Sequence, residues 1–70
     1  MHMTLSEFNK MTLHDQLDVT WEKGILEDHN THGDHFYLLY HLHDFYVEVA
    51  FSSQTHEITE VKTFSKNGSH

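Results

Sequence analysis

The chain has 70 residues, no cysteine, and a formal charge of −7 when its nine histidines are neutral. A chain of this length forms one small domain, and without cysteine it has neither disulfides nor thiolate metal sites. Only four residues are basic, which argues against nucleic acid or an anionic membrane as partner, because both require cations to neutralise phosphates. We therefore expect that the protein binds neither nucleic acid nor a membrane, and that it has no cofactor.

No apolar stretch is long enough to span a bilayer, and the N-terminus lacks the pattern of a signal peptide. We therefore expect a cytoplasmic protein. Residues 1–70 are predicted to form a single domain, with 66–70 as a frayed tail or a cloning remnant. His2 and His70 fall in such flanking sequence, so they are not candidates for chemistry.

The first third of the chain carries two helix-start signals. Residues 4–7 (TLSE) have the form of a capping box, in which Thr or Ser is followed three residues later by Glu. Residues 12–15 (TLHD) repeat the pattern with an acidic residue in the first turn. The sequence therefore predicts a short helix over 5–10 and a main helix over 13–23, with one helix over 5–23 as the alternative.

The predicted main helix has a narrow apolar stripe. Leu13, Leu17 and Trp21 recur every four residues, so they share one face of a helix. We expect this stripe to pack on a sheet, with Trp21 in the core. Gly24 follows Lys23 and is a typical stop for the helix.

Residues 35–51 (HFYLLYHLHDFYVEVAF) predict a central hairpin. Apolar side chains alternate along both halves, as they do in strands that bury one face. A two-residue turn at His43-Asp44 pairs the inward residues with one another, and a slip of one residue would turn all of them to the wrong face. The predicted pairs are Leu42 with Phe45, Tyr40 with Val47, Leu38 with Val49, and Phe36 with Phe51.

Two further strands are predicted around this hairpin. A short strand over 25–28 precedes turn-forming residues at 30–34. After a loop at 52–56, a last strand runs over 57–65.

The last predicted strand has an irregular pattern. Ile58 and Phe64 fall on one face, whereas Val61 falls on the other. A β-bulge near Thr59-Glu60 would turn Val61 inward.

Together these elements predict an α+β fold. An N-terminal helix, broken near residues 10–12, packs on one face of a three- to four-stranded antiparallel β-meander. The segments TLxEFNK (4–10), WxKG (21–24), DFYVEV (44–49) and IxxVxxF (58–64) resemble those of a group of short uncharacterised bacterial proteins with this layout. No activity is known for that group, so the resemblance implies a fold and no functional residue.

One face of the predicted hairpin is unusual for a solvated surface. Its outward positions carry aromatic, aliphatic and imidazole side chains with one carboxylate, and such patches usually mark a contact. Because the helix can cover only the opposite face, we expect a small interaction module that self-associates or binds another protein here. The predicted partner-binding residues are Tyr37, Leu39, His41, Tyr46 and Glu48.

Residues 27–35 (EDHNTHGDH) indicate a metal site as an alternative function. His29, His32 and His35 are spaced by three residues with carboxylates between them, and such ligands suit Zn, Ni or Cu. Binding there would be weak or adventitious, because nothing in the loop fixes its geometry. A second alternative, based on size and charge, is a small acidic inhibitor of a host or phage protein.

No pattern in the sequence predicts catalysis. His41 and Glu48 form the minimum for proton transfer, but an open sheet has no pocket that excludes water. The sequence contains no glycine-rich phosphate loop and no nucleophile elbow. We therefore expect a protein that is not an enzyme.

Overall fold

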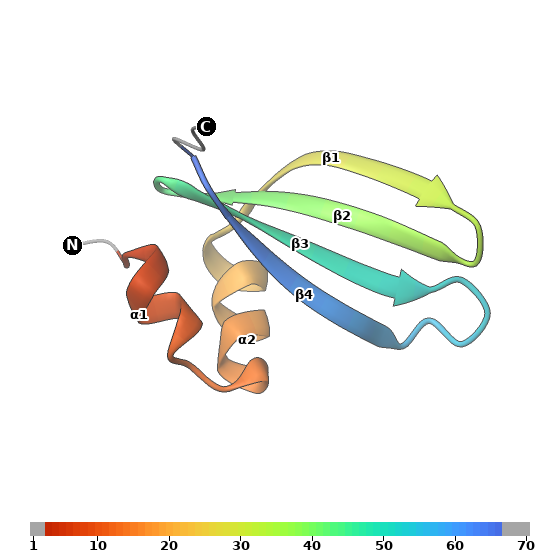
Figure 1. Ribbon diagram of the computed structural model, residues 1–70, viewed down its shortest axis with the longest axis horizontal. Helices are drawn as coiled ribbons and strands as arrows, with labels where there is room; N and C mark the ends of the chain where they lie inside the picture. Colours follow the sequence, from red (N-terminus) through yellow and green to blue (C-terminus); the bar gives the residue numbers. More distant parts are fainter. Residues whose placement is uncertain (1–2, 67–70) are drawn as a thin grey trace.

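The computed structural model describes residues 3–66 and shows two helices followed by a four-stranded sheet (Figure 1). The strands pair in chain order as an antiparallel meander, which confirms the predicted α+β fold. Of the predicted tail, residues 67–70 lie outside the described residues, as does His2. The elements are α1 (Leu5–Asn9), α2 (Leu13–Lys23), β1 (Ile25–His32), β2 (His35–Leu42), β3 (Phe45–Ser52) and β4 (Ile58–Ser65).

Both helices start where local hydrogen bonds satisfy their first N–H groups. At α1 the Thr4 hydroxyl accepts from the Glu7 N–H at 3.1 Å, and the Glu7 carboxylate accepts from the Thr4 N–H at 2.9 Å. At α2 the Thr12 hydroxyl accepts from the Asp15 N–H at 3.2 Å. Each bond satisfies a donor that has no partner inside the helix. The chain therefore forms two helices, and the alternative of one helix over 5–23 is wrong.

The buried face of α2 differs from the predicted stripe. Thr20 is fully buried, and its hydroxyl donates to the Gln16 carbonyl at 2.8 Å. Leu13 is 56% exposed, so the prediction that it covers the sheet is wrong. Trp21 is 44% exposed and lies at the margin of the core, where its ring packs edge-on against Tyr40 at 5.5 Å.

Small residues explain this orientation of α2. Thr20 is buried four residues before Gly24, and Gly24 lies close to β2. A β-carbon at Gly24 would lie 3.1 Å from Tyr40 and 3.2 Å from Leu42, so the end of the helix approaches the strand closely.

Of the predicted stripe, Leu17 packs against the core as expected, and Trp21 contacts Tyr40 and Phe51. Leu13 alone of the three is turned away from the sheet.

The central hairpin has the predicted register. The turn consists of His43 and Asp44, and His43 adopts the left-handed conformation at φ 42°. Because the four inward pairs face one another, one surface of the hairpin is continuous and apolar. The pairs are Leu42 with Phe45, Tyr40 with Val47, Leu38 with Val49, and Phe36 with Phe51.

Strand β1 is longer than the predicted strand over 25–28. It continues to His32, and the loop predicted at 30–34 is a turn at Gly33-Asp34, with Gly33 at φ 61°. All residues of β1 are exposed, because the strand lies at the edge of the sheet. Pairing with β2 keeps the polar second half of β1 extended. Its turn-forming residues therefore led to the incorrect prediction of a loop.

The predicted bulge in the last strand is confirmed at Thr59. Ile58 lies opposite Phe51 and Glu60 lies opposite Ala50, which leaves Thr59 as the extra residue. The Thr59 hydroxyl also donates to the Ala50 carbonyl at 3.3 Å. Every residue after the bulge therefore changes face relative to a regular strand.

This change of face decides where two apolar side chains of β4 lie. Val61 faces inward opposite Val49, as predicted. Phe64 lies opposite Tyr46 on the outward side, so the prediction that it shares a face with Ile58 is wrong. A single inserted residue accounts for both results.

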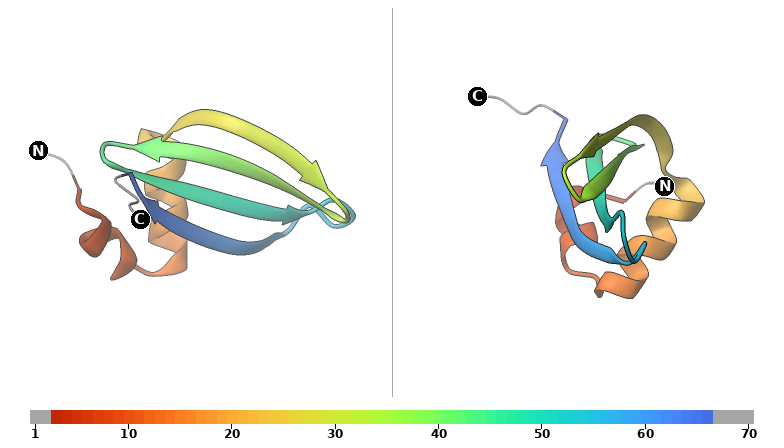
Figure 2. Two further views of the ribbon diagram at one scale, coloured as in Figure 1. Left: turned by 45° about the horizontal axis from the view of Figure 1, so that its top comes forward. Right: turned by 90° about the vertical axis from the view of Figure 1, so that its right-hand side faces the viewer.

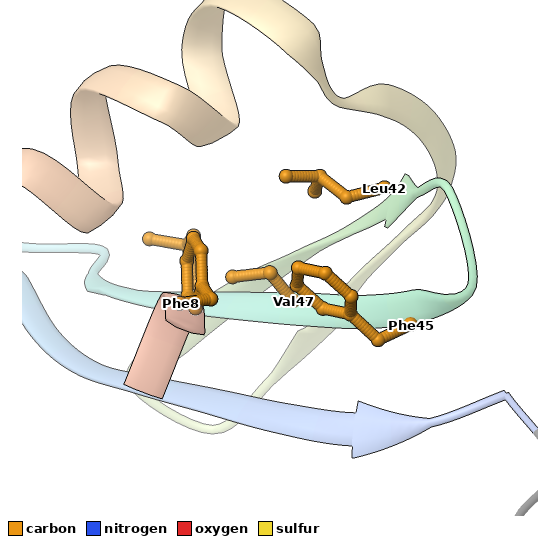
Figure 3. Close-up of a cluster of buried hydrophobic side chains, with 5 residues drawn as sticks. Phe8, Leu42, Phe45 and Val47 are labelled. Carbon is orange, nitrogen blue, oxygen red and sulfur yellow. The ribbon is translucent and has the colours of Figure 1, made fainter. Parts of the chain in front are cut away.

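The core lies between the inward side of the sheet and the two helices, which pack at the end of the sheet near the β2–β3 turn (Figure 1). Figure 2 shows α2 crossing behind the twisted sheet at that end. The Phe8 ring of α1 packs on Phe45 at 5.3 Å, in one cluster with Leu42 and Val47 (Figure 3). Within residues 3–66, neither helix has the length and apolar character needed to cross a membrane.

Candidate functional site

The predicted partner-binding residues lie together on the outward side of the sheet. Strand alternation places Tyr37, Leu39 and His41 of β2 opposite to the side that the helices cover. On β3, Tyr46 lies across from His41 and Glu48 lies across from Leu39. This outward surface is named the open face.

The strand register adds two apolar residues to the open face. Phe64 of β4 lies opposite Tyr46 and is 44% exposed. Ile25 of β1 lies opposite His41 and is 66% exposed. Sequence reasoning missed Phe64 because its face depends on the bulge at Thr59. It missed Ile25 because the register of β1 against β2 was not predicted.

On the open face, His41 lies beside a carboxylate and an aromatic ring. Its Nδ1 lies 3.4 Å from the Glu27 carboxylate, and its ring stacks on Tyr46 at 4.8 Å between centroids. The side chain is only 22% exposed, and Nε2 is buried without a hydrogen-bond partner among residues 3–66. The open face therefore holds its central imidazole by stacking and by one carboxylate.

Charges of both signs flank the aromatic centre of the open face. Glu48 lies opposite Lys62, which forms a cross-strand pair of unlike charges. A hollow beside Tyr37 and Leu39 has a volume of about 80 Å³, well below the ~300 Å³ at which small-molecule sites begin. A hollow of this size is smaller than typical small-molecule sites.

The three histidines of the predicted metal site are divided between the two sides of the sheet. His32 lies opposite His35 at the end of the β1–β2 hairpin, on the side of the open face. His29 lies opposite the inward residue Leu38, so its side chain is on the other side. The structure brings His32 and His35 together and separates His29 from them.

A different group of potential metal ligands lies on α2. Among residues 3–66, His14, Asp15 and Asp18 form the one group whose ligand atoms all lie within 4.8 Å of one another. All three residues are exposed, and His14 lies 3.4 Å from Asp18 one helical turn later. This is the ordinary spacing of an ion pair along a helix surface.

The fold and the open face define a small helix-on-meander protein. Comparisons with protein-family models, with curated proteins and with solved structures found no match to this chain. The function is therefore inferred from the residues of the open face and their geometry.

Proposed function

We propose that this protein is a small, non-enzymatic interaction module of the cytoplasm that self-associates through the open face. The observation that carries the proposal is the composition of that face, where Tyr37, Leu39, Tyr46 and Phe64 lie on the side of the sheet away from the helices. Tyrosine and phenylalanine are enriched at protein interfaces, whereas solvated sheet faces carry mainly charged and hydroxyl side chains.

A second copy of the chain is the simplest partner for such a face. Two copies related by a two-fold axis present the same patch to each other, and sheets stack face to face about 10 Å apart. The opposite charges of Glu48 and Lys62 lie on the same face, so a two-fold arrangement can place unlike charges together. Association also adds buried apolar surface to a chain of 70 residues, a size at which a single core stabilises weakly.

The dimensions of the sheet permit an interface of modest size. At the usual spacings, four strands of eight residues cover roughly 19 by 26 Å, or about 500 Å² in projection and more in accessible area. Specific dimers typically bury about 800 Å² on each partner. We therefore expect a reversible dimer at the lower end of the size range.

Light scattering coupled to size exclusion at pH 8 tests the proposal. The protein should run as a dimer whose population falls on dilution. Leu39→Lys and Phe64→Lys each place a charge on the open face and should give monomers. Leu13→Lys is the matched control, because Leu13 is a leucine that is 56% exposed on α2, and it should leave the dimer intact.

Circular dichroism and thermal melting would verify that each variant is folded. A wild-type protein that stays monomeric at high concentration contradicts self-association. A dimer that is disrupted by Leu13→Lys but not by the open-face variants also contradicts self-association through the open face.

A further inference from the structure

A cleft lies on the other side of the molecule, between the two helices and the β2–β3 turn. Its volume is about 640 Å³, and residues of α1, α2 and both central strands line it. Figure 1 shows α1 and α2 standing apart at this end of the sheet. The cleft is separate from the open face and shares no residue with it.

The walls and floor of the cleft are apolar. Met3, Met11 and Val19 are partly buried and form the walls, and all three pack against the hydrophobic core. Leu42 and Phe45, which are core residues, form the floor. Methionine side chains are flexible and adapt to the shape of an apolar ligand. A molecule in the cleft would therefore lie directly on the core of the protein.

Three ionisable side chains line the cleft, namely those of Glu7, Lys23 and His43. The Glu7 carboxylate already accepts the Thr4 N–H at 2.9 Å in the cap of α1. Lys23, at the end of α2, has no hydrogen bond or ion pair to another residue of the described chain 3–66. The ammonium of Lys23 is thus available to an anion held over an apolar surface.

We infer that the cleft binds a medium-chain aliphatic carboxylate, with its hydrocarbon on the methionine-lined walls and its carboxylate at Lys23. Small-molecule sites typically have volumes of about 300–1,000 Å³, are mainly apolar and use few polar groups to orient the ligand. At roughly 30 Å³ for each water-sized group, 640 Å³ holds about twenty non-hydrogen atoms. A ten-carbon acid, with about twelve such atoms, fits with room for hydration of its head group.

The head group is the feature that distinguishes this site from an unselective apolar patch. The chain carries a formal charge of −7, so its overall field favours a cationic amphiphile over an anionic one. Recognition by Lys23 predicts the reverse order. Decanoate should bind more tightly than decanol, and decanol more tightly than decyltrimethylammonium.

Amide chemical-shift titrations at pH 7.5 and 150 mM salt, with these three probes below their micelle concentrations, test the inference. The amides of α1, of the second half of α2 and of residues 42–45 should shift, while those at the centre of the open face should not. Lys23→Gln should weaken decanoate binding by about two- to fivefold, the range of an exposed ion pair, and should leave decanol binding unchanged.

Two further variants of α2 distinguish the effect of a bulky ring inside the cleft from the effect of the same ring elsewhere on the surface. Val19→Phe narrows the cleft and should weaken both decanoate and decanol. Leu13→Phe adds the same ring at an exposed position outside the cleft and should weaken neither. Tighter binding of the cationic probe, equal decanoate affinity of wild type and Lys23→Gln, shifts centred on the open face, or no binding would each overturn the inference.

Discussion

Replacement of Gly24 by alanine tests how closely α2 lies against the sheet. Gly24 has φ −76° and ψ 149°, a conformation that any residue adopts. The backbone conformation at position 24 therefore does not require glycine. In open space, alanine would raise the free energy of unfolding by about 0.4–1 kcal/mol, because it restricts the unfolded chain. The sign of the effect depends on the room for a β-carbon.

That room is missing at Gly24. The added β-carbon would lie 2.6 Å from the carbonyl oxygen of Thr20, a backbone atom that cannot move without shifting the last turn of α2. It would also crowd Tyr40 and Leu42 on β2. Overpacking of this kind costs about 1–3 kcal/mol. After the gain in the unfolded chain, Gly24→Ala should lower the free energy of unfolding by about 1–2 kcal/mol.

Urea denaturation followed by circular dichroism measures this difference. For a domain of this size, Tm should fall by about 4–8 °C for each kcal/mol. Gly33→Ala is the control, because Gly33 has φ 61° and nothing within 4 Å of an added β-carbon, so only backbone strain should appear there. Gly33→Asn should relieve part of that strain, since asparagine tolerates this conformation. A Gly24→Ala protein more stable than wild type would refute the close approach of α2 to β2.

Three further substitutions test the core, the open face and a helix start by the same denaturation assay. Val47→Ala removes two methyl groups from a fully buried position and should cost about 2–3 kcal/mol; a loss below about 0.5 kcal/mol would place Val47 outside a packed core. His41→Phe keeps the ring stack with Tyr46 and removes the buried Nε2 that has no partner within residues 3–66. Stability should stay equal or rise by up to about 1 kcal/mol, and a clear loss would show that the contact with Glu27 outweighs the buried nitrogen. Thr12→Ala should cost about 1 kcal/mol, and no change would mean that the Thr12 hydroxyl does not cap α2.

The parts of the fold that could be predicted from the sequence rest on local signals. The capping box at Thr4 and the second cap at Thr12 each act within three residues, so they fix where α1 and α2 begin. The hairpin register follows from alternation together with the two-residue turn at His43-Asp44, because this pairing sets inward side chains opposite one another. Long-range contacts determine the rest. The orientation of α2 depends on the close approach at Gly24, and the length of β1 depends on pairing with β2.

The candidate sites likewise contain residues that local sequence patterns predict and residues that only long-range contacts bring together. The predicted residues of the open face lie together because they belong to one hairpin, whose short turn fixes the distance between its strands. Phe64 joins them only through the bulge at Thr59, whose effect on the face of Phe64 was not predicted. The cleft could not be predicted at all, because Met3, Met11 and Val19 come from separate segments that meet only in the folded chain.

Isotope-filtered nuclear Overhauser spectra, recorded on an equal mixture of ¹³C-labelled and unlabelled protein, test the central claim most directly. Self-association through the open face predicts intermolecular contacts among the side chains of Tyr37, Leu39, Tyr46 and Phe64, and these contacts should disappear in Leu39→Lys. Intermolecular contacts confined to the helices, or no intermolecular contacts at concentrations where the protein remains soluble, would contradict the account.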